Sequence, residues 1–71
     1  MITVDSFVNL FMDQDTGLFR NQIAIITESE DLVFDSSLPE EDPCGIIDLP
    51  ILESPVKKSY TFDNGTLIIV I

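Results

Sequence analysis

The end of the chain carries the strongest constraint on the fold. Residues 56–62 and 66–71 are rich in β-branched and aromatic residues, and Asp63-Asn64-Gly65 separates them. Asn-Gly between two such runs is a strong β-hairpin signal, because both residues accept positive φ angles. Residues 67–71 are apolar at every position, which is typical of a strand buried on both faces. We therefore predict a hairpin over residues 56–71 whose second strand lies inside a sheet.

Two earlier segments predict the rest of the sheet and a helix. Residues 22–27 and 31–35 are short and rich in β-branched residues, and residues 28–30 form a polar break, so a second hairpin is expected over residues 22–35. Residues 3–12 predict an amphipathic helix with Thr3 as N-cap and a stop at Gly17. Their apolar residues recur at the spacing of one helix face: Val4, Phe7, Val8 and Phe11.

Residues 36–55 differ in composition from the rest of the chain. They contain all four prolines and the only cysteine, Cys44, and they are strongly acidic. We expect an acidic, proline-rich loop with one helical turn that Ser37 begins and Pro43 ends. Residues 49–52 are expected to run extended along the sheet edge.

The expected fold class is α+β, with one domain spanning residues 1–71. The N-terminal amphipathic helix packs on a small four-stranded, mainly antiparallel sheet built from the two hairpins. Although high net charge is typical of disordered chains, this chain is 45% hydrophobic with a mean hydropathy of +0.31. That apolar content favours a folded core, with the charge placed at the surface.

The charge is concentrated in the middle of the chain. The formal net charge is −10, and residues 28–55 contain nine carboxylates and no basic residue. This balance excludes nonspecific binding to nucleic acid or anionic lipid, which requires Lys and Arg to displace counterions. Clustered acids predict a binding face that imitates phosphates, whereas a solvated loop is the ordinary alternative. Lys57 and Lys58 are expected to pair weakly with this segment. The residues predicted to contact a partner are Glu28, Glu30, Asp31, Asp35, Glu40, Glu41 and Asp42.

Motifs for catalysis and metal binding are weak. The chain has no histidine, which removes the usual general base. Asp13-x-Asp15-x-Gly17 begins like a calcium loop, but Leu18 and Ala24 occupy the positions that require Gly and Glu. Cys44 lies beside acids that disfavour a reactive thiolate. We predict a non-enzymatic protein with no cofactor and no metal.

The expected location is the cytosol. A single cysteine forms no internal disulfide, the N-terminus lacks the basic region of a signal peptide, and the longest apolar run has about five residues, too short for a membrane span.

The layout of the chain resembles that of small accessory proteins of phages and mobile elements. The likeness rests on the opening I-T-V-D-S-F-V-N-L-F, the acidic middle and the ending Y-T-F-D-N-G-T-L-I-I-V-I. In size and charge the chain is similar to acidic inhibitors of host defence, such as anti-CRISPR proteins, anti-restriction proteins and inhibitors of uracil-DNA glycosylase. The resemblance implies docking on a basic nucleic-acid-binding surface of a host protein, with a CRISPR effector as the favoured partner.

A second hypothesis assigns the protein to another class. In this interpretation the charge serves solubility, and the protein is an interaction or homodimerising module that binds by adding a strand at a sheet edge. The C-terminal hairpin or residues 46–55 would supply that edge. Salt-tolerant binding would distinguish this module from a phosphate mimic.

Overall fold

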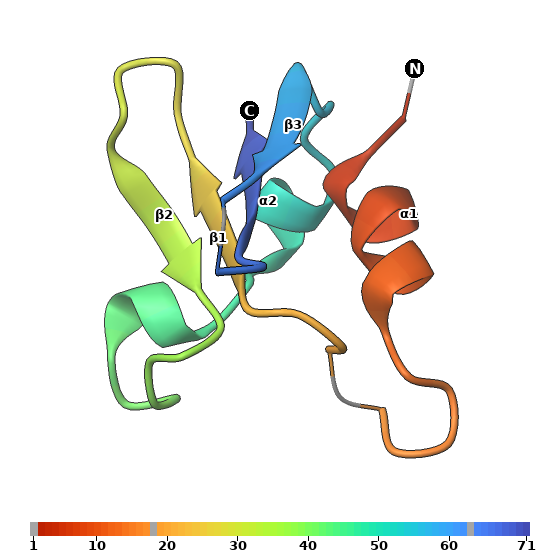
Figure 1. Ribbon diagram of the computed structural model, residues 1–71. Helices are drawn as coiled ribbons and strands as arrows, with labels where there is room; N and C mark the ends of the chain where they lie inside the picture. Colours follow the sequence, from red (N-terminus) through yellow and green to blue (C-terminus); the bar gives the residue numbers. More distant parts are fainter. Residues whose placement is uncertain (1, 18, 63) are drawn as a thin grey trace.

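The structure is a computed structural model that describes residues 2–17, 19–62 and 64–71, and its framework is two hairpins joined in one sheet (Figure 1). The first hairpin consists of β1 (Ile23–Ile26) and β2 (Leu32–Asp35), and the second of β3 (Lys58–Thr61) and β4 (Leu67–Val70). The strand order is β2-β1-β4-β3. Each hairpin is antiparallel, whereas β1 and β4 pair in parallel. The predicted α+β class is confirmed, with the sheet mostly antiparallel and one parallel pair at its centre.

The position of β4 agrees with its apolar sequence. It lies between β1 and β3, and all four of its residues are buried. Its register runs from Leu67 opposite Ile23 to Val70 opposite Ile26. The prediction that residues 67–71 form a central strand is therefore confirmed for the four residues of β4. Asp63, which the predicted turn includes, lies outside the described residues.

The N-terminal helix is shorter than predicted but begins as expected. α1 (Val4–Val8) continues as the 3-10 helix η1 (Asn9–Phe11). The Thr3 side chain accepts a hydrogen bond of 3.3 Å from the Ser6 backbone N–H, which satisfies one free donor of the first turn. Gly17 has φ +72° in the loop that follows the helix, as the stop signal predicted.

Two expectations for residues 36–55 are wrong. The helical turn does not end at Pro43 but begins there, as the 3-10 helix η2 (Pro43–Gly45), because the Asp42 side chain accepts a hydrogen bond from the Cys44 N–H at 2.8 Å. Residues 49–52 are not extended; they form α2 (Leu49–Leu52). Asp48 caps α2 by accepting a hydrogen bond from the Ile51 N–H at 3.1 Å. In both places an acidic cap followed closely by a proline favours a helix start.

The main core lies on one face of the sheet. Val4 and Val8 of α1 pack there with Ile23, Ile25, Phe34, Leu67 and Ile69, and Ile51 and Leu52 of α2 pack against the same cluster. Phe19 is partly buried against it. A hydrogen bond of 2.9 Å from the Val4 N–H to the Ser54 carbonyl ties α1 to the segment after α2. No helix formed by the described residues is long and apolar enough to span a membrane.

Candidate functional site

The turn between β1 and β2 places three predicted site residues at one tip of the molecule. The Thr27 N–H donates to the Asp31 carbonyl at 3.0 Å, and the Glu30 N–H donates to the Thr27 carbonyl at 2.9 Å. Glu30 has φ +67°, in the left-handed region that favours glycine. The side chains of Glu28, Glu30 and Asp31 are all exposed. This turn therefore presents three carboxylates within four consecutive residues.

Two lysines from a distant part of the sequence lie beside this tip. The Lys57 Nζ atom is 2.9 Å from the Glu28 Oε1 atom, and both side chains are more than half exposed. Such a surface pair contributes little to stability, but it commits Glu28 to an internal partner. The sequence prediction that the lysines pair with the acidic segment is confirmed for Lys57. The charge at the tip is consequently less negative than the count over residues 28–55 indicated.

The loop after β2 presents the second acidic group. Glu40 and Glu41 are exposed in a turn, whereas Asp42 is half-buried and caps η2. The Asp42 N–H donates to the Pro39 carbonyl at 3.0 Å. Gly45 closes the loop against the same residue, because a Cβ atom at Gly45 would overlap the Pro39 carbonyl. The loop is thus held by internal contacts that leave the Glu40 and Glu41 carboxylates facing solvent.

Asp35 at the end of β2 is engaged within the protein. Its Oδ1 atom accepts hydrogen bonds from the Ser37 N–H at 2.9 Å and from the Ser37 hydroxyl at 2.7 Å. The side-chain amide of Gln22 donates to the same atom at 3.4 Å. The backbone and side-chain hydrogen bonds from Ser37 lower the pKa of Asp35 below its ordinary value of 3.8, and partial burial opposes them. Asp35 therefore stabilises the corner between β2 and the acidic loop.

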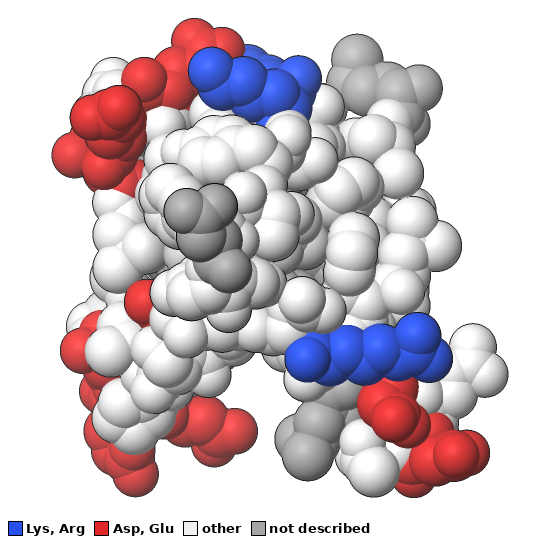
Figure 2. All heavy atoms as spheres, in the orientation of Figure 1, with Lys and Arg blue, Asp and Glu red and all other residues white. Residues whose placement is uncertain are grey.

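The predicted residues form two groups rather than one continuous lattice. Figure 2 shows acidic atoms over the β1–β2 turn and over the loop after β2, along one side of the molecule, with a mostly uncharged surface between them. Glu28, Asp35 and Asp42 have side-chain partners inside the protein. No side-chain hydrogen bond or ion pair is formed within the described residues by the other four: Glu30, Asp31, Glu40 and Glu41.

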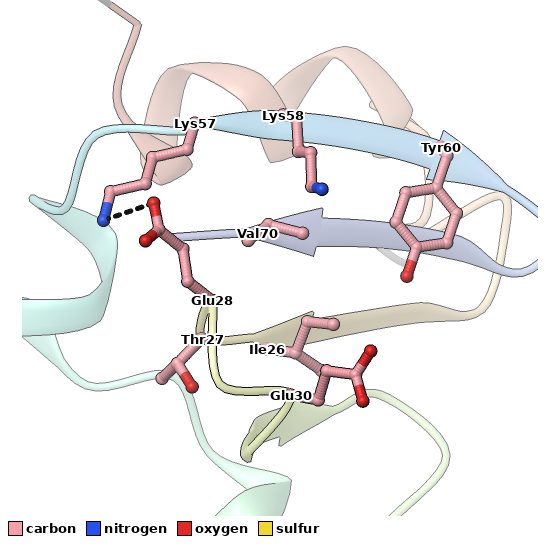
Figure 3. Close-up of a pocket in the computed structure, with 8 residues that line it drawn as sticks. All are labelled: Ile26, Thr27, Glu28, Glu30, Lys57, Lys58, Tyr60 and Val70. Carbon is pink, nitrogen blue, oxygen red and sulfur yellow. Dashed lines mark ion pairs between the residues drawn. The ribbon is translucent and has the colours of Figure 1, made fainter.

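A pocket of about 460 Å³ beside the tip was not anticipated from the sequence. Residues from the β1–β2 turn and from β3 face each other across it (Figure 3). The alternation along residues 56–62 predicts that Lys58 and Tyr60 lie on the same face of their strand. The sequence does not show that this face lies near the β1–β2 turn, because that depends on the order of the strands in the sheet. The lining residues are Ile26, Thr27, Glu28, Glu30, Lys57, Lys58, Tyr60 and Val70.

The arrangement is that of a small α+β domain with an acidic side, and the chemistry of its side chains suits recognition of a cationic surface. Within the described ranges, no three metal-ligating side chains come together. Cys44 is a free, half-buried thiol whose Sγ atom lies 3.8 Å from the Leu32 carbonyl oxygen. No protein-family model, curated protein or solved structure matches this chain.

Proposed function

We propose that the protein is a non-enzymatic inhibitor that docks its acidic side on a basic nucleic-acid-binding surface of another protein. Host defence proteins that act on nucleic acid are the proposed partners, and a CRISPR effector is the first to test. Binding in the host cytosol would exclude the nucleic acid from its site. The preference for this target class rests on size and charge analogy.

The observation that supports the proposal is the set of carboxylates that have no side-chain partner among the residues that the structure describes. Glu30 and Asp31 belong to the β1–β2 turn, at one end of the acidic side, and Glu40 and Glu41 belong to the loop after β2, at the other end. A site that holds phosphates through Arg and Lys is complementary to such groups, because charge-assisted hydrogen bonds to carboxylate and phosphate oxygens have similar geometry. The separation of the two groups suits two basic clusters on the partner better than one continuous strip.

Competition with nucleic acid tests this proposal directly. Fluorescent duplex DNA is bound to purified CRISPR effectors, restriction enzymes and a uracil-DNA glycosylase, and its displacement by the protein is measured at several salt concentrations. We expect displacement from at least one target, with an affinity that falls steeply as salt rises. If the protein displaces DNA from none of them, the proposal is wrong.

Charge position is separated from total charge by two matched double variants. Glu40→Gln with Glu41→Gln removes two charges from the acidic side, and Asp5→Asn with Asp15→Asn removes two exposed charges elsewhere. Because rim charges chiefly set association rates, we expect the first variant to inhibit about tenfold less well and the second less than about twofold less well. Equal losses in the two variants would show that only net charge matters.

A second candidate function is favoured by the exposure of β3. This strand is at the edge of the sheet, and all four of its residues are exposed. β4 is interior and residues 49–52 are helical, so β3 is the part of the predicted edge that remains open to a partner strand. Strand addition would tolerate salt and would protect β3 amides from hydrogen exchange. Protection at the β1–β2 turn and the acidic loop instead would favour the inhibitor.

A further inference from the structure

The two faces of the sheet are covered differently. α1 and α2 both pack on the face that carries Ile23, Ile25, Leu67 and Ile69. The opposite face carries a separate cluster of Ala24, Ile68 and Val70, with Ile26 packed against it, and no helical residue among those described belongs to that cluster. Tyr60 lies opposite Ile68 in the sheet register, and Lys58 lies opposite Val70. Ala24, Ile68 and Val70 are nevertheless buried, and the long side chains of Lys58 and Tyr60 on the edge strand lie beside them.

The pocket lies at the end of the face opposite α1 and α2. Ile26 and Val70 form its apolar floor, and Figure 3 shows Lys58 and Tyr60 reaching over it from β3. The Glu30 carboxylate lies on the opposite side, at the β1–β2 turn. Tyr60 is 42% exposed, and its ring packs edge-to-face on Phe62 with 5.6 Å between centroids. The phenol is thus held in place while one part of it remains open to solvent.

The charges around the pocket favour a cation. Glu28 and Lys57 neutralise each other through their 2.9 Å contact. Glu30 and Lys58 have no ion pair within the part of the chain that the structure describes. Asp31 follows Glu30 directly and is exposed, and the whole chain has a net charge of −10. The negative electrostatic field of the whole chain adds to the field of the charges around the pocket. A positive group therefore has a more favourable electrostatic energy here than a negative group.

We propose that this pocket receives an arginine side chain of the partner protein, which deepens the proposed function and rests on it for the source of the arginine. The aliphatic stem would lie on Ile26 and Val70, and the guanidinium would pair with Glu30. The Tyr60 ring offers a face for cation–π stacking, which a planar guanidinium uses better than an ammonium group. A second copy is a poor source, because the chain has one arginine and each copy carries −10.

The probe that tests the pocket needs no partner protein. N-acetyl-arginine amide is titrated into the isotope-labelled protein and followed by NMR, and N-acetyl-citrulline amide serves as the uncharged isostere. Shift changes are expected at Ile26, Glu30, Tyr60 and Val70. A charge-assisted contact predicts that arginine binds at least about fivefold more tightly than citrulline. Equal binding of the two probes, or shifts confined to other residues, would overturn the proposal.

Substitutions at three pocket residues define the role of each wall. Glu30→Gln should remove the preference for arginine, whereas Asp15→Asn, an equal change of charge outside the pocket and the acidic side, should retain it. Tyr60→Phe should bind like the parent protein and Tyr60→Leu more weakly. Lys58→Ala should tighten arginine binding at least about twofold, because it removes the repelling ammonium group. Weaker binding by Lys58→Ala would mean that the pocket takes an anion, which contradicts the proposal.

The two proposals fail in different ways. If citrulline and arginine bind equally but Glu40→Gln with Glu41→Gln still weakens inhibition, the acidic side docks without the pocket. If arginine binds as described but the protein displaces DNA from no target, the pocket recognises cations and the inhibitor proposal is wrong.

Discussion

The two hairpin turns have the same backbone hydrogen bonds but different residues at the position that determines their strain. In the first, the Thr27 N–H donates to Asp31 and the Glu30 N–H to Thr27; in the second, Phe62 donates to Thr66 and Gly65 to Phe62. Glu30 has φ +67° and Gly65 has φ +88°. Glycine adopts this conformation without a steric penalty, whereas a residue with a Cβ atom loses about 1 kcal/mol or more.

The two turns therefore differ at one equivalent position, which is glycine in the second turn and a carboxylate residue in the first. Among the described residues, two neutral side chains contact the second turn: the Asn64 side chain accepts from the Thr66 N–H at 3.0 Å, and the Asn21 amide donates to the Gly65 carbonyl at 3.0 Å. The first turn and the nearby end of β3 are joined by an ion pair. Glu30 thus places a carboxylate at the mouth of the pocket, although its backbone conformation is one that favours glycine.

The largest effect is expected at the second turn. Gly65→Val should lower the free energy of unfolding by about 3 kcal/mol, because a β-branched residue is a severe outlier at this φ angle. Urea denaturation measures the change. Gly65→Asn is the control and should lose only about 1 kcal/mol, since asparagine tolerates the left-handed region. Equal losses for Val and Asn would show that the backbone conformation at Gly65 is not what the stability depends on.

The opposite sign is expected at the first turn. Glu30→Gly should raise the free energy of unfolding by about 1 kcal/mol, because it relieves the left-handed strain. The same variant should weaken binding of the arginine probe, as Glu30→Gln does. Ser29→Gly is the control, since Glu30 is the one non-glycine residue with positive φ among those described, and it should give no gain. A destabilised Glu30→Gly protein would contradict the comparison between the turns.

The smallest effect concerns pH. Hydrogen bonds from Ser37 lower the pKa of Asp35 in the folded protein below its ordinary value of 3.8. Its contribution to stability is therefore present above that ordinary pKa and is lost as pH falls through the lower folded value. At neutral pH, Asp35→Asn should cost about 0.5 kcal/mol, reduced by solvent screening. Unfolding curves at pH 7 and at about pH 3 should show this difference shrinking in acid. A difference that stays constant would exclude an ionised Asp35 as the cause.

Local features of the fold were predictable from the sequence because neighbouring residues determine them. Thr3 caps its helix through a residue three positions away, and the two turns close between residues four positions apart. Residues 49–52 form a helix rather than the expected extended segment, because Asp48 caps it and Pro50 lies in its first turn. The parallel pairing of β1 with β4 does not follow from the sequence, since each strand's sequence is compatible with either direction.

The candidate site was less predictable because it depends on where turns and strands lie in space. The sequence identifies Glu30, Asp31, Glu40 and Glu41 as acidic, but only the structure shows that they fall into two groups. Lys57 is far from Glu28 in sequence, so a count of charge along the chain does not include their contact. The pocket likewise needs β3 and the β1–β2 turn together.

The parallel pair at the centre of the sheet also has a consequence for how fast the chain folds. The paired residues of each hairpin are close in sequence. Ile23 and Leu67, by contrast, are separated by nearly two thirds of the chain, so their pairing closes a long loop. Closing such a long loop costs entropy before the contact contributes any stability, and folding slows as contacts become less local. We expect the hairpins to form early and the β1–β4 ladder to limit the rate, so substitutions at Ile69 should slow folding more than substitutions in either turn.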